Sequence, residues 1–83
     1  MKVYIQNLKE LAERIEEYIT MFPKSATTIE NIQDCILNDY NRNNGTTGLF
    51  GIQVSQEWED KCYGFEFVSH TPITYRFIGM IKC

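Results

Sequence analysis

The residues best suited to chemistry in this chain are three cysteines and one histidine, which are its soft metal ligands. The cysteines are also candidate nucleophiles, and the histidine is the one imidazole in the sequence. The four residues are Cys35, Cys62, His70 and Cys83. A structural zinc ion would need all four, and zinc ligands usually come in pairs about two to four residues apart, because one tight turn then presents both to the ion. Here the successive separations are 27, 8 and 13 residues. The spacing therefore predicts neither a metal site nor another cofactor.

The chain also lacks a convincing pairing of catalytic side chains. A cysteine nucleophile needs a base within hydrogen-bond reach, and Cys62 would meet His70 only across the end of a sheet. The carboxylate pairs at 16–17 and 59–60 have no apolar walls to raise a pKa for acid–base work. Segment 45–48 lacks the lysine and the following helix of a phosphate-binding loop. We predict that the protein is not an enzyme and has no catalytic residues.

Composition limits both the fold and the partners. The 83 residues, 43% hydrophobic and 13% aromatic, suffice for one small core, so we predict a single domain over 1–83. The net charge is −3, and the eight Lys and Arg residues are scattered singly. Aromatic residues on strands can stack bases, but proteins that do so also supply basic groups for the phosphates. Nucleic-acid binding is therefore the less favoured alternative, and we expect no membrane partner.

The start of the chain and the cysteine count predict the compartment. No apolar core of a signal peptide is present in the first residues, which read MKVYIQNLKEL, and no apolar run is long enough to cross a bilayer. Three cysteines are an odd number and include no closely spaced pair, which favours reduced thiols over a disulfide framework. We predict a cytoplasmic protein.

Apolar residues spaced three and four positions apart predict a first amphipathic helix over about 8–22. Asn7 and Glu10 have the spacing of a capping box, in which each side chain bonds the backbone of the other, and Pro23 ends the pattern. Residues 2–5 fit either a short extra N-terminal strand or a lead-in to this helix. Four residues do not decide between the two.

The same spacing predicts a second helix over about 28–41. It opens with another capping-box pattern, from Thr27 to Glu30, and we expect Cys35 to be a small core residue beside its apolar positions. After Gly48 the apolar period changes from that of a helix to that of a strand. Three strands are predicted, over about 49–56, 61–69 and 73–82.

The register of the strands follows from keeping the aromatic residues on one face of the sheet. Four pairs are expected: Phe50 with Phe67, Ile52 with Phe65, Phe65 with Phe77, and Phe67 with Tyr75. The same register sets Glu66 opposite Arg76 on the other face, where opposite charges attract. The predicted fold is α+β, with two N-terminal helices packed on one face of a three-stranded antiparallel β-meander.

Two groups of residues are candidates for contact with a protein partner. Trp58 lies in a predicted turn among acidic residues, namely Glu57, Glu59 and Asp60. Trp is common at interface hot spots, although it can equally fold over the sheet edge and cap the core. The second group is the acidic side of the first helix, Glu13, Glu16 and Glu17 together with Glu10, although many such charge runs are only solvated faces.

From these features we predict a non-enzymatic protein-binding module, a small acidic modulator or inhibitor of a larger partner with a basic surface. By analogy of size and charge alone, such proteins are common among phage and mobile-element products that inhibit nucleic-acid-handling machinery, anti-CRISPR proteins included. The alternative is a structural domain that self-associates as a homodimer through an exposed sheet edge.

Overall fold

The computed structural model describes residues 2–24, 27–43, 48–53 and 60–83. The elements in chain order are β1 (Tyr4–Gln6), α1 (Leu8–Met21), α2 (Ile29–Arg42), β2 (Leu49–Ile52), β3 (Lys61–His70) and β4 (Ile73–Lys82). The predicted α+β class is confirmed. The sheet has four strands in the order β1-β4-β3-β2, with β1 parallel to β4 and the other neighbours antiparallel. The sheet is therefore not the predicted three-stranded meander, because the short extra N-terminal strand that the sequence left open is present as β1 and adds a fourth, parallel strand.

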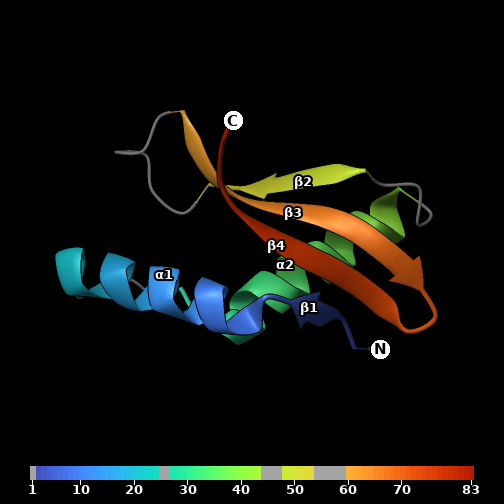
Figure 1. Ribbon diagram of the computed structural model, residues 1–83, viewed down its shortest axis with the longest axis horizontal. Coiled ribbons are helices and arrows are strands. Elements are labelled where there is room, and N and C mark those ends of the chain that lie inside the picture. Colours follow the sequence, from blue (N-terminus) through green and yellow to red (C-terminus); the bar gives the residue numbers. More distant parts are fainter. Residues whose placement is uncertain (1, 25–26, 44–47, 54–59) are drawn as a thin grey trace.

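The core lies between the sheet and the two helices. In Figure 1, α2 runs behind β3 and β4, and the second half of α1 extends beyond the end of the sheet. Four aromatic side chains, Tyr63, Phe65, Tyr75 and Phe77, are 0% exposed, as predicted from their alternation along the strands. They pack against apolar residues of both helices, including Leu11, Ile15, Ile32 and Ile36. Full burial of one such side chain stabilises the folded state by about 2 to 3 kcal/mol.

The register of β3 and β4 follows the prediction over its central part. Phe65 faces Phe77, Phe67 faces Tyr75, and Glu66 faces Arg76. The predicted register of β2 is wrong, because Phe50 pairs with Phe65 instead of Phe67. A slip by an even number of residues keeps every side chain on its own face, so the alternation of apolar residues alone could not exclude it.

An irregularity in β3 and β4 changes which residues face the core near the end of β4. The register shifts between Gly64 and Phe65, and opposite this point Gly79 has a φ of 90°, a left-handed conformation that side chains with a Cβ rarely adopt. Beyond Gly79, Met80 packs against the core. Ile81 instead lies on the other face, where its Cγ2 would be 2.6 Å from a Cβ placed on Gly64.

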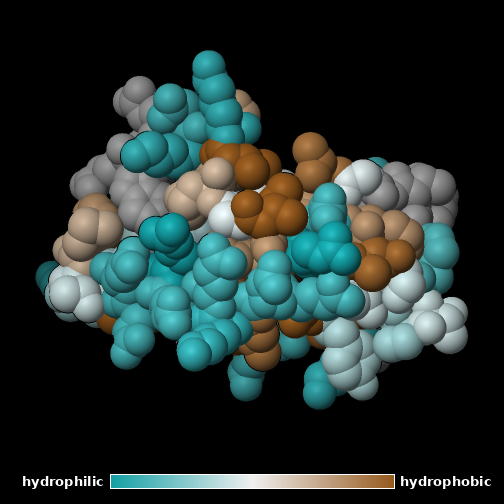
Figure 2. Space-filling model, in the orientation of Figure 1, coloured by the Kyte–Doolittle hydropathy of each residue, from teal (hydrophilic) through white to brown (hydrophobic). Residues whose placement is uncertain are grey.

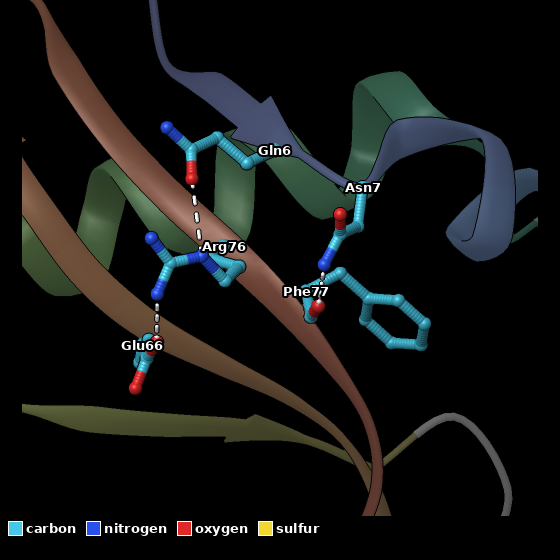
Figure 3. Close-up of polar contacts among 5 residues, drawn as sticks. All are labelled: Gln6, Asn7, Glu66, Arg76 and Phe77. Carbon is cyan, nitrogen blue, oxygen red and sulfur yellow. Dashed lines mark hydrogen bonds and ion pairs between the residues drawn. The ribbon is translucent and has the colours of Figure 1, made fainter.

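The first helix begins differently from the prediction. Asn7 is the N-cap residue, but it has a φ of 63° and its side chain forms no capping bond, so the predicted capping box with Glu10 is wrong. Its Nδ2 instead donates to the backbone carbonyl of Phe77 at 2.9 Å (Figure 3). Nearby, Arg76 donates to Gln6 Oε1 from Nε at 3.1 Å and contacts Glu66 through Nη1. These contacts fasten β1 and the start of α1 to β4.

The second helix is capped by a threonine, but one residue later than the predicted box from Thr27 to Glu30, and it buries fewer residues than predicted. The Thr28 hydroxyl accepts a hydrogen bond from the Asn31 backbone N–H at 3.1 Å, which satisfies one of the open donors of the first turn. Ile32 and Ile36 are buried, but Cys35 is exposed, so the prediction that it is a core residue is wrong. Neither described helix combines the length and the apolar character needed to span a membrane.

A disulfide joins the start of β3 to the end of the chain. Cys62 and Cys83 are bonded, with their Cα atoms 5.5 Å apart. The backbone N–H of Cys83 also donates to the carbonyl of Asp60 at 3.0 Å. The prediction of reduced thiols is therefore wrong for these two residues, because antiparallel pairing of β3 with β4 brings cysteines distant in sequence to the same end of the sheet.

Candidate protein-interaction surface

The acidic face of α1, as we define it, consists of Glu10, Glu13, Glu16 and Glu17, all of which are exposed. The opposite stripe of the helix is buried and consists of Leu11, Ile15 and Tyr18. Because residues three and four apart share one side of a helix, burial of that stripe turns the glutamates outward. Figure 2 shows hydrophilic side chains covering α1, below hydrophobic ones that gather over the strands. The structure therefore brings the predicted glutamates together on one surface.

Three of these glutamates line a shallow hollow of about 390 Å³, namely Glu13, Glu16 and Glu17 together with Thr20. The Thr20 hydroxyl donates to the Glu16 backbone carbonyl at 2.9 Å. Arg14 Nη1 lies 3.5 Å from Glu17 Oε2, with both side chains largely exposed. An exposed ion pair of this kind is worth at most about 1 kcal/mol, so a basic group of a partner can replace Arg14 at low cost.

A groove of about 360 Å³ adjoins the acidic face and separates α1 from β3 and β4. Its lining combines apolar and charged residues: Arg14, Glu17, Met21, Lys61, Tyr63 and Met80. Met21 is 59% exposed and gives the groove a flexible apolar rim. A groove of mixed apolar and charged lining beside a row of carboxylates suits a partner segment that carries both basic and apolar side chains.

Tyr63 forms the floor of this groove and is held in place by its own hydroxyl. The hydroxyl donates to the Arg14 backbone carbonyl at 3.3 Å. Burial raises the pKa of Tyr63 to about 12, with smaller increases from Tyr18 and Glu17 and a decrease from Arg14. The phenol is therefore neutral at physiological pH and links α1 to β3 as a hydrogen-bond donor.

The second predicted group of partner-binding residues is only partly described. Glu57, Trp58 and Glu59 lie outside the described residues, so the choice between an interface anchor and a core cap for Trp58 stays a prediction. Asp60 is exposed just before β3. It lines a hollow with Lys61 and Lys82, and this hollow includes no residue of the acidic face of α1.

The soft ligands do not gather at one site, although Cys62 and Cys83 are bonded to each other. Cys62 begins β3 and is disulfide-bonded, whereas His70 ends that strand, eight residues and about 26 Å away at ordinary strand rise. A Cys62–His70 dyad is therefore not formed. Cys35 is exposed on α2. Within the ranges that the structure describes, no group of three or more His, Cys, Asp or Glu residues is placed to hold a metal ion.

Two features of the structure escaped the sequence analysis. One is the disulfide, for which the predicted pairing of 61–69 with 73–82 was a usable signal, because it already places Cys62 near the C-terminal end of the chain. The other is a contact between Tyr40 on α2 and His70 at the end of β3. The Tyr40 hydroxyl lies 2.9 Å from His70 Nδ1. No sequence pattern relates these two residues, which come together only through packing of α2 on the sheet.

No protein-family model matches this sequence. Neither the curated proteins nor the solved structures contain a significant match to the chain. The function is therefore argued from the surface of the molecule itself.

Proposed function

We propose that this chain is a non-enzymatic protein-binding module that docks the acidic face of α1 onto a basic surface of a larger partner. The supporting observation is the alignment of four exposed glutamates, Glu10, Glu13, Glu16 and Glu17, along one helix. The glutamates outnumber the exposed Lys9 and Arg14 of this helix, and such an excess of one sign attracts a partner of the opposite sign, speeds association and selects against wrong partners. Rigid attachment of α1 to the sheet, through buried residues on its opposite side, fixes the spacing of these carboxylates.

The proposed action on the partner is occupation of a surface it needs for its own work. A basic groove that binds nucleic acid carries the charge that the acidic face complements, so a nucleic-acid-handling protein is the proposed class of target. The chain would then inhibit by competing with phosphates for the same Lys and Arg residues. Phage or mobile-element inhibitors of the anti-CRISPR kind act on targets of this class. This chain is compared with them only in its small size and its acidic charge.

A pair of charge-reversal variants tests the surface. The first, Glu13→Lys/Glu16→Lys, reverses the centre of the acidic face. The control, Glu30→Lys/Asp34→Lys, makes the same change in net charge on exposed positions of α2. Both variants and the parent chain are used to capture proteins from the native host, and circular dichroism checks that all three fold. We expect the specific partner to be captured by the parent and the control and lost from the first variant. Equal capture by both variants would exclude the acidic face.

The salt dependence of binding tests the electrostatic part of the proposal separately. Exposed charges are screened beyond about 8 Å at physiological ionic strength and beyond about 3 Å at 1 M salt. We therefore expect the affinity for the captured partner to fall steeply as salt rises. Unchanged affinity from low to high salt would leave a binding module without the proposed charge mechanism.

Self-association is the second candidate, because one observation favours it. Leu49 is 68% exposed on β2, the last strand at one side of the described sheet. An apolar edge strand can pair with a second copy across a dimer axis. Sedimentation over a concentration series distinguishes the two candidates. A dimer that becomes monomeric on Leu49→Lys supports self-association, and a monomer at all concentrations removes it.

The proposal includes the cytoplasmic location predicted from the sequence, and the disulfide argues against that part. Disulfides persist mainly in oxidising compartments and are rare in reduced cytosol. Trapping free thiols at the moment of cell lysis, followed by mass spectrometry, would decide it. A cytoplasmic protein is expected to be labelled at Cys62 and Cys83, whereas labelling at Cys35 alone points to an oxidising compartment.

A further inference from the structure

A second hollow, of about 370 Å³, lies at the β3–β4 turn and shares no residue with the acidic face of α1. It is lined by Lys2 and Tyr4 at the start of the chain, by Tyr40 of α2, and by the turn residues 70–73. These segments are far apart in the sequence, and Figure 1 shows β1 beginning beside the β3–β4 turn. No carboxylate is among the described residues that line this hollow. It is therefore a locally basic and aromatic site on an acidic protein.

The His70 ring is held in a fixed position within this hollow. Its Nδ1 is 2.9 Å from the Tyr40 hydroxyl, and its ring centroid lies 4.6 Å from that of Phe67 and 5.8 Å from that of Tyr40. When the Tyr40 hydroxyl donates to Nδ1, the neutral ring carries its proton on Nε2, and a charged ring carries one there as well. In that arrangement, which the 2.9 Å contact allows, His70 has an Nε2–H donor to offer to an acceptor.

The turn that carries His70 is itself braced. Both Ser69 and Thr74 donate their hydroxyls to the backbone carbonyl of Pro72, at 2.8 and 2.9 Å. Ile73 is 5% exposed and supplies an apolar base. A site whose walls are held by packing and hydrogen bonds loses little conformational entropy when a ligand binds.

The N-terminal side of the hollow supplies an ammonium group and an exposed aromatic ring. Lys2 Nζ lies 5.4 Å from the centroid of the Tyr4 ring, within the range of a cation–π contact. Tyr4 is 48% exposed. An ammonium group, an imidazole N–H and two tyrosine rings thus converge on one hollow, and its volume falls within the range of small-ligand sites.

We propose that this hollow binds a small anion that carries an aromatic ring. Lys2 and His70 Nε2 contact the anionic group, and the rings of Tyr4 and Tyr40 contact the aromatic part. A phosphate or a carboxylate can provide the anionic group, because both accept charge-assisted hydrogen bonds from these donors. Ring stacking alone is weak at an exposed site, so the two parts of the ligand are needed together.

The single histidine makes the test direct, because the one imidazole signal in a nuclear magnetic resonance spectrum belongs to His70. The full chain is titrated with phenyl phosphate and, separately, with phenylacetate. Inorganic phosphate and phenol serve as the two halves of the ligand. We expect a saturable shift of the His70 ring signals with at least one aromatic anion, and at least about fivefold weaker binding of either half. The tighter of the two aromatic anions identifies the anionic group.

Two matched variants locate the binding. Lys2→Gln removes the ammonium group from the hollow and should weaken binding about threefold to fivefold. Lys82→Gln removes an exposed lysine at the opposite end of β4, and should leave binding unchanged. The backbone amide spectrum shows that each variant is folded. The proposal is overturned if neither aromatic anion gives a saturable His70 shift, if inorganic phosphate binds as tightly as phenyl phosphate, or if the two variants have equal effects.

Discussion

Removing the Cys62–Cys83 disulfide should strongly destabilise the protein. The bond closes a loop with a sequence separation of 21 residues. In the chain-entropy description, such a loop restricts the unfolded chain enough to stabilise the folded state by about 3 kcal/mol. A domain of this size has a total stability of about 4 to 12 kcal/mol at typical values per residue. The disulfide should therefore provide a large share of the free energy of unfolding.

Urea unfolding of three samples measures this contribution: the oxidised chain, the chain with a phosphine reductant, and the Cys62→Ala/Cys83→Ala variant. With a urea m-value of about 1 kcal/mol/M, the midpoint should fall by about 3 M in the second and third samples. The thermal midpoint should fall by about 12 to 24 °C. Reductant should have no effect on the double variant, because the remaining thiol, Cys35, is not disulfide-bonded. Equal midpoints for the oxidised and reduced chains would refute the reasoning.

Three further predictions concern two glycines and the buried phenol. Gly64→Ala should cost about 1 to 3 kcal/mol by overpacking against Ile81, and the double variant with Ile81→Ala should cost less than the sum of the two single changes. A Cβ added at Gly79 would meet no atom within 4 Å, but the residue has a φ of 90°, so Gly79→Ala should cost about 1 to 2 kcal/mol of backbone strain. Ile81→Ala should not reduce this cost. An equal reduction of the cost at Gly64 and at Gly79 would contradict the assignment. Folding raises the pKa of Tyr63 from 10.0 to about 12, so the contribution of Tyr63 to stability should be fully present below pH 10 and be lost as the pH rises through 12, with a loss of at most about 2 to 3 kcal/mol because solvent screens part of the effect. Chemical unfolding at stepped pH should show this loss in the parent and a smaller one in Tyr63→Phe, and identical curves would remove Tyr63 as the cause.

The sequence predicted the fold correctly where the spacing of apolar residues follows from their burial in the core. The two helices and the aromatic core could be predicted, because Phe65 and Phe77 must share the dry face of the sheet. Glu66 and Arg76 agreed with that register from the other face. Two independent criteria, hydrophobic and electrostatic, thus selected one pairing of β3 with β4.

The errors in the fold arise where several arrangements satisfy the same pattern. Phe50 can face Phe65 or Phe67 without leaving the core side, so the position of β2 was not determined by alternation. The left-handed backbone at Gly79 reverses the faces that follow, and Ile81 therefore lies outside although the period-two pattern places it inside. The segment before Asn7, for which the sequence left a strand and a helix lead-in open, is a strand because it pairs with β4, which lies at the other end of the chain.

The candidate site was predictable in part for the same reason. The exposure of Glu13 and Glu16 follows from local helix geometry, which the sequence determines once the buried stripe is known. The hollow at the β3–β4 turn depends on three segments, around Lys2, Tyr40 and His70, that meet only in the folded chain. Local patterns carry no information about such a meeting.

The central claim is that the acidic face of α1 is the surface that a basic partner binds. Titration calorimetry of the captured partner with Glu13→Lys/Glu16→Lys and with Glu30→Lys/Asp34→Lys tests it at matched net charge. We expect at least about tenfold weaker binding for the first variant, and at most about twofold for the second. Indistinguishable affinities for the two variants would contradict it.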